Sequence, residues 1–422
     1  MRSQTESEAA WDEPTAESWL LSLELFGIDF GLDRIKRLLE SLGGPQQLPR
    51  LVHVVGSNGK SSVTRMTAAI VAAHGLKVGA YLSPHFVSFT ERILINGAPC
   101  DPQQFGSAAQ AVSQAATEIE REQPSSGPIT QFEALTAIAF VVFKGAGVDA
   151  AVIEAGLGGR LDATNVIDSS VQVCTGVALE HTALLGDTVE LIATEKLAVV
   201  KPGGTLVVTA DLDPAALDVA LVRCAEESAR LVVAGRDAPE LLAAQGEFQR
   251  SNFALAAAAA HALLGALDAR ATERAAAEIR IPGRYEICAS EPKTILDGAH
   301  NVDGAAALRA SLELENLNGK LIGCLSVLDD KDAEAMLSTL GPCSDQLIFT
   351  RATHPRALDP AELAATNERL GGPPSLVVDS PHDALRDARA AAGAGGLVYA
   401  AGSLYLIADL KRSPDAKGGS TL

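Results

Sequence analysis

A glycine-rich turn between an apolar strand and a helix is the feature that most constrains how this chain folds. Residues 51–55, Leu-Val-His-Val-Val, have the length and apolar character of a buried strand, and Gly-Ser-Asn-Gly-Lys-Ser-Ser follows at 56–62. A helical pattern then runs from Lys60 to His74, before a second strand expected over Lys77–Ser83. This order predicts a βαβ unit, and therefore a sheet with parallel strands.

The composition of the turn favours phosphate binding. Its glycines allow several backbone N–H groups to point into one concavity, and the following helix adds the positive end of its dipole. Lys60 supplies a full charge for phosphate oxygens, and Ser61 or Ser62 supplies a hydroxyl near a metal ion. The common phosphate loop has four residues between its glycines, whereas here only Ser57 and Asn58 separate them. A purely structural turn is therefore the alternative.

The rest of the chain repeats the alternation of strands and helices, which predicts an α/β fold in two domains. Residues 1–281 are expected to form a P-loop-containing domain with a mostly parallel sheet, and residues 286–422 a smaller, Rossmann-like, doubly wound domain. Ligands of such sheets bind at the carboxyl ends of the strands, so we expect the domains to face each other across a crevice there. The other predicted strands are 149–154, 171–177, 205–209, 293–297, 320–327, 345–350, 375–378 and 396–401. The other predicted helices lie within 18–42, at 133–144, 188–199, 252–264, 304–314, 333–340, 360–370 and 381–392, and from Ser403 onward.

Composition argues against several classes of partner. The 422 residues carry 34 basic and 53 acidic side chains, a net charge of −19, without a run of Lys or Arg, so we expect neither nucleic acid nor a membrane as a partner. The six cysteines form no Cys-x-x-Cys pair and are interpreted as free thiols. The acidic N-terminus does not resemble a secretion signal, and no apolar stretch approaches the roughly 20 residues that span a bilayer. These features favour a cytoplasmic enzyme.

Polar residues at other predicted strand ends are further candidates for a site. Glu154 ends a buried strand before the glycine-rich segment 155–165, where a Mg²⁺ ligand is expected in a phosphate-handling α/β enzyme; a carboxylate that caps a loop is the alternative. His181 follows a strand and Lys196 lies within a helix. Taken alone, these two are explained more simply as an ordinary histidine and a solvated lysine.

The second domain carries two such polar segments. Asp297-Gly298-Ala299-His300-Asn301 ends its first strand, a position that suits nucleotide contacts as well as it suits a polar turn. Asp329-Asp330-Lys331-Asp332 by itself reads as a surface charge cluster. Neither segment identifies a function without the others.

Taken together, these motifs resemble the folylpolyglutamate synthase/dihydrofolate synthase family, a branch of the Mur-type ligases. The resemblance runs from about Trp19 to about Leu410, and its longest motif is Glu-Ala-Gly-Leu-Gly-Gly-Arg-Leu-Asp-Ala-Thr-Asn at 154–165. The other matching segments, in the same order, are 27–34, 52–62, 83–85, 90–93, 131–133, 185–188, 195–196, 248–252, 282–284, 297–301, 330–332 and 402–405.

The resemblance implies a role for each motif. It implies that ATP is bound by Asn58, Gly59, Lys60, Ser61, Ser62, Asn252, Arg284 and Asp297. For two Mg²⁺ ions, it implies the ligands Ser83, Glu154, His181 and Lys196, the last in carbamylated form. It implies that the pterin site is bordered by Gln131, Phe132, Glu133, Leu161, Asp162 and Ala163. The residues implied in catalysis are Lys60, Lys196 and His300, and both His300 and Lys331 are expected in the cleft.

The activity that the resemblance implies is an ATP-dependent acid–amino-acid ligase. ATP phosphorylates a carboxylate of dihydropteroate or of a folate's terminal glutamate, and the amine of L-glutamate attacks the acyl phosphate. The product is dihydrofolate, folylpolyglutamate or both, and a monomer is expected. Catalysis of this kind rests mostly on positioning and on neutralising phosphoryl charge.

Four positions depart from the family pattern. Ser57 and Ser61 stand where the family has Thr and Gly, Glu180 replaces the Asp before the metal-binding His, and Val302 replaces a Pro. None of them removes an implied ligand. Two alternatives follow: a Mur-type ligase that acts on a different carboxylate, and a nucleotide-binding protein that has lost catalysis. The intact set of Lys60, Glu154, His181 and Lys196 argues against the second.

Overall fold

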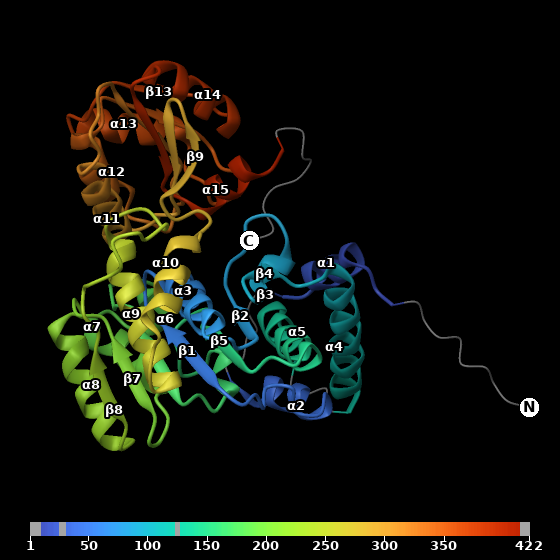
Figure 1. Cartoon of the computed structure of the whole chain (residues 1–422). Coiled ribbons are helices and arrows are strands. Elements are labelled where there is room, and N and C mark those ends of the chain that lie inside the picture. The colour runs from blue at the N-terminus through green and yellow to red at the C-terminus, as the bar shows by residue number, and fades with distance from the viewer. Residues whose placement is uncertain (1–9, 25–30, 123–126, 414–422) are drawn as a thin grey trace, which may run out of the picture. The chain divides into compact units, whose positions relative to one another are not determined.

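The structure, a computed structural model, describes residues 10–24, 31–122 and 127–413, which form two compact units (Figure 1). Unit 1 comprises residues 1–83, 88–234 and 256–268, and unit 2 comprises 84–87, 235–255 and 269–422. Unit 2 therefore takes in three segments before residue 282 that the sequence assigned to the first domain. The N-terminal tail and residues 27–30 of the 27–34 motif lie outside the described residues.

Unit 1 is built on an eight-stranded sheet in the order β4-β3-β2-β5-β1-β6-β7-β8. The central strand β1 (Leu51–Val55) runs parallel to β5 (Ala150–Glu154) and to β6 (Val171–Cys174). Every residue of these three strands is buried, as expected for parallel strands covered on both faces. The remaining strands are β2 (Val78–Tyr81), the antiparallel β3 (Ile93–Ile95) and β4 (Ala98–Pro99), and the parallel β7 (Thr205–Val208) and β8 (Arg230–Val233).

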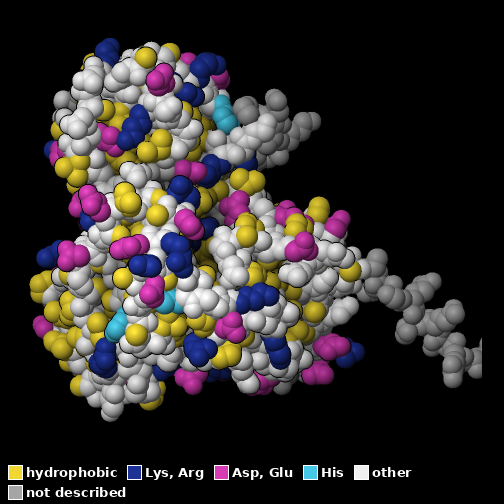
Figure 2. All heavy atoms as spheres, in the orientation of Figure 1, with side chains coloured by type: hydrophobic (Ala, Val, Ile, Leu, Met, Phe, Trp, Pro, Cys, Tyr) yellow, Lys and Arg dark blue, Asp and Glu magenta, His cyan; other side chains and the backbone are white. Residues whose placement is uncertain are grey.

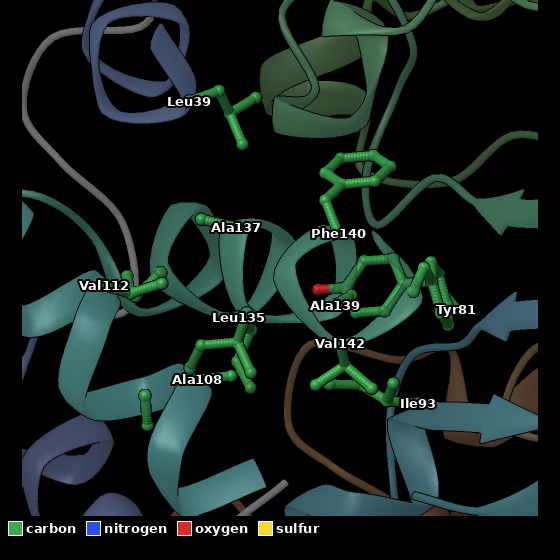
Figure 3. Packing of buried hydrophobic residues seen from close by; sticks show 14 of the residues in the cluster. Leu39, Tyr81, Ile93, Ala108, Val112, Leu135, Ala137, Ala139, Phe140 and Val142 are labelled. Carbon is green, nitrogen blue, oxygen red and sulfur yellow. The ribbon is translucent and has the colours of Figure 1, made fainter. Parts of the chain in front are cut away.

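The helices of unit 1 bury a core of mostly aliphatic side chains, since aromatics make up only 4% of the sequence. Figure 3 shows part of it, in which Leu135, Phe140, Val112, Tyr81 and Ile93 belong to one cluster. The helices are α1 (Glu13–Ser22), α2 (Asp33–Ser41), α3 (Lys60–Ala73), α4 (Pro102–Glu122), α5 (Gln131–Ala146), α6 (Thr182–Leu185), α7 (Val189–Lys196) and α8 (Pro214–Glu226), with the 3-10 turns η1 (Phe89–Arg92), η3 (Ala163–Val166) and η4 (Leu197–Val199). α9 (Phe248–Leu264) begins in unit 2 and ends in unit 1.

Unit 2 contains a six-stranded sheet in the order β13-β12-β11-β14-β10-β9, in which only β9 runs antiparallel to its neighbour. Buried clusters lie on both faces: α11, α12 and α13 pack on one and α14 and α15 on the other, which is a doubly wound arrangement. The strands are β9 (Glu286–Ser290), β10 (Lys293–Leu296), β11 (Leu321–Leu325), β12 (Gln346–Phe349), β13 (Ser375–Val377) and β14 (Leu397–Ala401). The helices are α10 (Ala269–Glu278), α11 (Val302–Leu312), α12 (Ala333–Leu340), α13 (Pro360–Arg369), α14 (Pro381–Ala392) and α15 (Leu404–Lys411), with the 3-10 turn η5 (Gly341–Cys343).

The α/β fold class expected from the sequence is confirmed, because both units have mostly parallel sheets. The sequence did not predict α4, α8, α10 or the short antiparallel strands at the sheet edges. Among the described residues, no helix is long and apolar enough to cross a membrane. On the face shown in Figure 2, Lys and Arg side chains are interspersed with Asp and Glu rather than gathered by sign.

Candidate active site

The phosphate-type loop follows β1 and is held against the end of β6. Gly56 and Gly59 have φ angles of +141° and +85°, which side-chain-bearing residues rarely adopt. A Cβ on Gly56 would lie 2.1 Å from Thr175 Oγ1, so this position accepts only glycine. The Thr175 hydroxyl donates a hydrogen bond to the carbonyl of Asn58 at 2.6 Å. The loop is therefore a fixed part of the sheet edge.

Two lysines converge on the first carbonyl of this loop. Lys60 Nζ and Lys196 Nζ donate to the Gly56 oxygen at 2.9 Å and 3.0 Å. Lys196 is buried, and its ammonium also pairs with Glu180 Oε1 at 2.9 Å. Burial disfavours the charged form of Glu180, but the positive charges of Lys196 and Lys60 outweigh it and lower the pKa of Glu180 to about 2. Two cations, Lys60 and Lys196, and the ionised carboxylate of Glu180 thus lie at the phosphate-type loop.

A group of oxygen ligands lies beside the start of α3. Ser61 Oγ donates to Glu154 Oε1 at 2.9 Å, and the backbone N–H of Ser83 donates to Glu154 Oε2 at 3.3 Å. Parallel pairing of β1 with β5 and of β5 with β2 explains this, because the carboxyl ends of all three strands meet at one sheet edge. Carboxylate and hydroxyl oxygens are ligands that Mg²⁺ prefers, so this group fits a magnesium ion.

Ser62, expected near the phosphates, and His181, expected near the metal, have different surroundings from the group around Glu154. The Ser62 hydroxyl is buried with no hydrogen-bond partner among the described residues, a cost that an oxygen-rich ligand could relieve. His181 is exposed, with a left-handed φ of +47°, at the start of α6. Within the described ranges, no group of three or more His, Cys, Asp or Glu side chains is arranged to hold a metal. The oxygen group around Glu154 is thus the better-assembled part of the expected metal site.

The residues expected to border the pterin site come from the start of α5. The Phe132 ring packs on Gly156, where a Cβ would lie 2.6 Å from Phe132 Cζ, so α5 contacts the glycine-rich loop after β5. Gln131 is buried, and its Nε2 donates to Leu20 O at 2.9 Å. Glu133 closes a capping box with Thr130 and pairs with Arg34 at 3.2 Å. Gln131 and Glu133 therefore hold the α5 turn, while Phe132 contacts the loop.

The segment Leu161-Asp162-Ala163 leads into the 3-10 turn η3, which contacts α5. Leu161 is half exposed and Ala163 is buried. Asp162 is buried; its Oδ2 accepts from the Leu157 N–H at 2.9 Å, and its Oδ1 accepts from both the N–H and the hydroxyl of Thr164. Burial raises the pKa of Asp162, and these hydrogen bonds oppose the rise. Asp162 therefore braces the glycine-rich loop.

The sequence did not point to the partner of this brace, His53 in the centre of β1. His53 Nε2 lies 2.8 Å from Thr164 Oγ1, and His53 is fully buried. Burial, together with the charge of Lys201, lowers the pKa of His53 to about 3. The only indication in the sequence is the mostly apolar run 51–55, and this pattern does not distinguish a buried polar residue from its apolar neighbours.

Unit 2 carries the other residues expected to contact the nucleotide. Asp297 Oδ1 accepts from the Ala299 N–H at 2.8 Å and Oδ2 from the Tyr285 N–H at 2.7 Å. Burial raises the pKa of Asp297, and the charge of Arg284 opposes the rise. The Arg284 guanidinium lies on Gly298, where a Cβ would be 1.8 Å from Nη1. Arg284 and Asp297 are therefore brought together.

The last three expected residues also belong to unit 2. His300 Nδ1 donates to the carbonyl of Gly298 at 2.8 Å, which orients its ring. Asn252 Nδ2 donates to Gln249 Oε1 at 2.9 Å on α9. Lys331 pairs with Asp330 at 3.0 Å. His300 thus lies in the same segment as Asp297.

Comparison with known proteins identifies relatives over almost the whole chain. The model of the Mur ligase, glutamate ligase domain family matches residues 283–404. The dihydrofolate synthase/folylpolyglutamate synthase of Mycobacterium tuberculosis is 36% identical over 398 residues, which cover 85% of this chain and 82% of that protein. A solved structure of the M. tuberculosis folylpolyglutamate synthase complexed with ADP superposes with a TM-score of 0.87 at 32% identity, covering 96% of this chain and 100% of that one.

Two further solved structures are described with small molecules. E. coli FolC in complex with DHPP and ADP has a TM-score of 0.84 at 30% identity and covers 95% of this chain and 97% of that one. A bifunctional folylpolyglutamate synthase/dihydrofolate synthase with Mn, AMPPNP and L-glutamate bound has a TM-score of 0.81 at 29% identity, covering 94% and 97%. The resemblance found in the sequence is thereby confirmed: the chain belongs to the dihydrofolate synthase/folylpolyglutamate synthase family of ATP-dependent ligases.

Proposed function

We propose that this chain joins L-glutamate to dihydropteroate, to the γ-carboxylate of a folate, or to both, with ATP as the source of energy. The family to which it belongs supports the reaction class, and the ADP, AMPPNP, DHPP and L-glutamate of the solved relatives support the substrates. The observation that carries the proposal is the convergence of Lys60, Ser61, Ser83 and Glu154 at one sheet edge.

The reaction requires two transfers. A carboxylate oxygen of the pterin substrate attacks the γ-phosphorus of ATP, the bond to the bridging oxygen breaks, and ADP leaves. The amine of L-glutamate then attacks the acyl carbon, a proton leaves the nitrogen, and inorganic phosphate departs with the electron pair of the C–O bond. Lys60 neutralises charge on the phosphates, and the N–H groups of the loop orient them.

For metal, the residues present fit a magnesium ion through Ser61, Ser83 and Glu154, and His181 completes the proposed ligands. Bound Mg²⁺ supplies charge neutralisation for the transferred phosphoryl group. A second ion held by carbamylated Lys196 is also proposed, because an ammonium has no lone pair to give a metal ion and Mg²⁺ prefers anionic oxygen ligands to an amine. This form requires the ammonium pair with Glu180 to be replaced.

The remaining roles follow the same assignment. We propose that Asn58, Gly59 and Ser62 bind the phosphates, and that Asn252, Arg284 and Asp297 contact the nucleotide. Phe132, Leu161 and Ala163 border the pterin, and Gln131, Glu133 and Asp162 shape that border through the hydrogen bonds described above. His300 is proposed to act on the reacting groups, with Lys331 nearby. The chain is proposed to act as a monomer.

A single panel of reactions tests the proposal. ADP release is measured with dihydropteroate or tetrahydrofolate, each with L-glutamate and with a small set of other amino acids. We expect release that depends on both a pterin and L-glutamate. If neither pterin supports turnover, the folate assignment is wrong. Turnover with another amino acid and a different carboxylate would favour another Mur-type ligase.

A further inference from the structure

Residues 84–87 belong to unit 2, although Ser83 before them and Ser88 after them belong to unit 1. Ser83 is one of the proposed metal ligands, so the chain passes directly from that ligand into the other unit. Phe86 of this segment is half buried and packs against the cluster formed by β10, β14, α14 and α15.

Phe86 contacts the turn before β9. Gly283 has a φ of +64°, and a Cβ there would lie 2.4 Å from Phe86 Cζ. Glycine is therefore required at 283 for two independent reasons, the backbone conformation and the close approach of the ring. The Phe86 ring occupies the space that a side chain at 283 would otherwise fill.

An ion pair lies beside the same turn. Lys411 Nζ lies 5.8 Å from the centroid of the Phe86 ring, within the range of a cation–π interaction, and 2.7 Å from both carboxylate oxygens of Glu286. Glu286 Oε2 in turn accepts from the Gly283 N–H at 2.6 Å. Ring, ammonium, carboxylate and turn thus form one connected group.

The turn carries Arg284, one of the proposed nucleotide contacts. The Gly283 carbonyl accepts from the Gly298 N–H at 2.8 Å and from Arg284 Nη1 at 3.2 Å. The guanidinium lies on Gly298, where there is no room for a side chain. The position of Gly283 therefore sets the position of the Arg284 guanidinium.

We infer that Phe86 is a positioning residue that couples the Ser83 segment to the Gly283–Arg284 turn, so that metal binding and nucleotide binding depend on one another. The inference rests on the proposed function for the roles of Ser83 and Arg284. Phe86 itself touches neither substrate nor metal in this assignment. It acts by fixing the covalent path between a metal ligand and the turn that holds the arginine.

The test compares Phe86→Ala and Phe86→Leu with Leu385→Ala. Leu385 of α14 is also half buried against the same cluster, so it is a matched control for lost apolar contact. In steady-state ADP release, we expect Phe86→Ala to raise the KM for ATP and the Mg²⁺ concentration for half-maximal rate by about tenfold or more, since small displacements of positioned groups are costly. Phe86→Leu should restore part of the loss, and Leu385→Ala should keep both values within about twofold of the wild type.

A purely structural role of Phe86 would lower the amount of active enzyme, and hence kcat, without moving either constant. That result, or equal constants for Phe86→Ala and Leu385→Ala, overturns the inference. The affinity for ADP with and without Mg²⁺ is measured by calorimetry on the same proteins. If the wild type releases no ADP with either pterin, the proposed function fails, and the calorimetric coupling between ADP and Mg²⁺ still decides the role of Phe86.

Discussion

Lys196 Nζ and Glu180 Oε1 lie 2.9 Å apart, and the lysine is almost completely buried. The ammonium has a second acceptor in the carbonyl of Gly56. The resemblance found in the sequence implies an Asp at position 180, and the Glu that stands there forms this pair. Through these two contacts, Lys196 links the phosphate-type loop to the segment after β6.

Removal of this carboxylate should destabilise the fold. Glu180→Gln leaves a buried ammonium without its counter-ion, and we expect a loss of about 3 kcal/mol in the free energy of unfolding at pH 7. Because the pKa of Glu180 is lowered in the folded state to about 2, its contribution is present above the unfolded value of 4.5 and is lost as the pH falls toward 2. Urea unfolding at pH 7 and at pH 3 measures both effects. A difference between wild type and variant that does not shrink at the lower pH would contradict the assignment.

Loss of Lys196 tests the carbamate. Lys196→Ala should reduce ADP release strongly, and a small carboxylate such as acetate should restore part of the rate by taking the place of the anionic ligand. Lys201→Ala is the matched control, since Lys201 is half buried and donates to Asn165, outside the phosphate-type loop. Unchanged activity in Lys196→Ala refutes the carbamate role, and a rescue that occurs equally in the Lys201 variant shows an unspecific effect.

Loss of Glu154 should remove the metal site. We expect Glu154→Ala to lower the rate by about 100-fold or more, because Glu154 is proposed to hold the ion that neutralises charge on the transferred phosphoryl group. Ser61→Gly should keep activity and shift only the Mg²⁺ dependence, since Ser61 donates to Glu154. Full ADP release by Glu154→Ala with dihydropteroate and glutamate would contradict the assignment of Glu154 as a metal ligand. Glu195→Ala, which removes a carboxylate that lies near Gly158 of the glycine-rich loop but is paired with Arg160, serves as control.

His53 should make stability depend on pH. Burial lowers its pKa to about 3 in the folded state, against about 6.5 in the unfolded chain, so the unfolded state binds more protons as the pH falls below 6.5. Between pH 7 and pH 5 this costs the wild type about 2 kcal/mol of unfolding free energy. His53→Leu should lose that component, as measured by urea unfolding at the two pH values. An identical pH dependence in both proteins would show that His53 titrates alike in the folded and unfolded states.

The sequence was most informative where one local rule applied. The apolar run 51–55 followed by Gly56 predicted β1 and the loop correctly, because a buried parallel strand needs an unbroken apolar stretch. The Ala-rich helix α4 and the short strands β3 and β4 were missed, since short strands and small-residue helices have weak periodicity. The pairing of Glu180 with Lys196 could not be predicted, because it joins residues that are separated by a helix and a turn.

What the sequence determined by itself is the reaction class: its ordered motifs place the chain in a ligase family, and the comparisons confirm that placement. What only the tertiary structure decided is which side chains share a site and which ones serve the fold. Glu133 and Asp162 belong to motifs, yet their oxygens accept hydrogen bonds that cap a helix and brace a loop. The sequence assigned no role to Phe86 or to His53, yet one packs on Gly283 and the other bonds to Thr164. The physical reason is that hydrogen bonding and close packing depend on distances across the fold, which residue order alone does not specify.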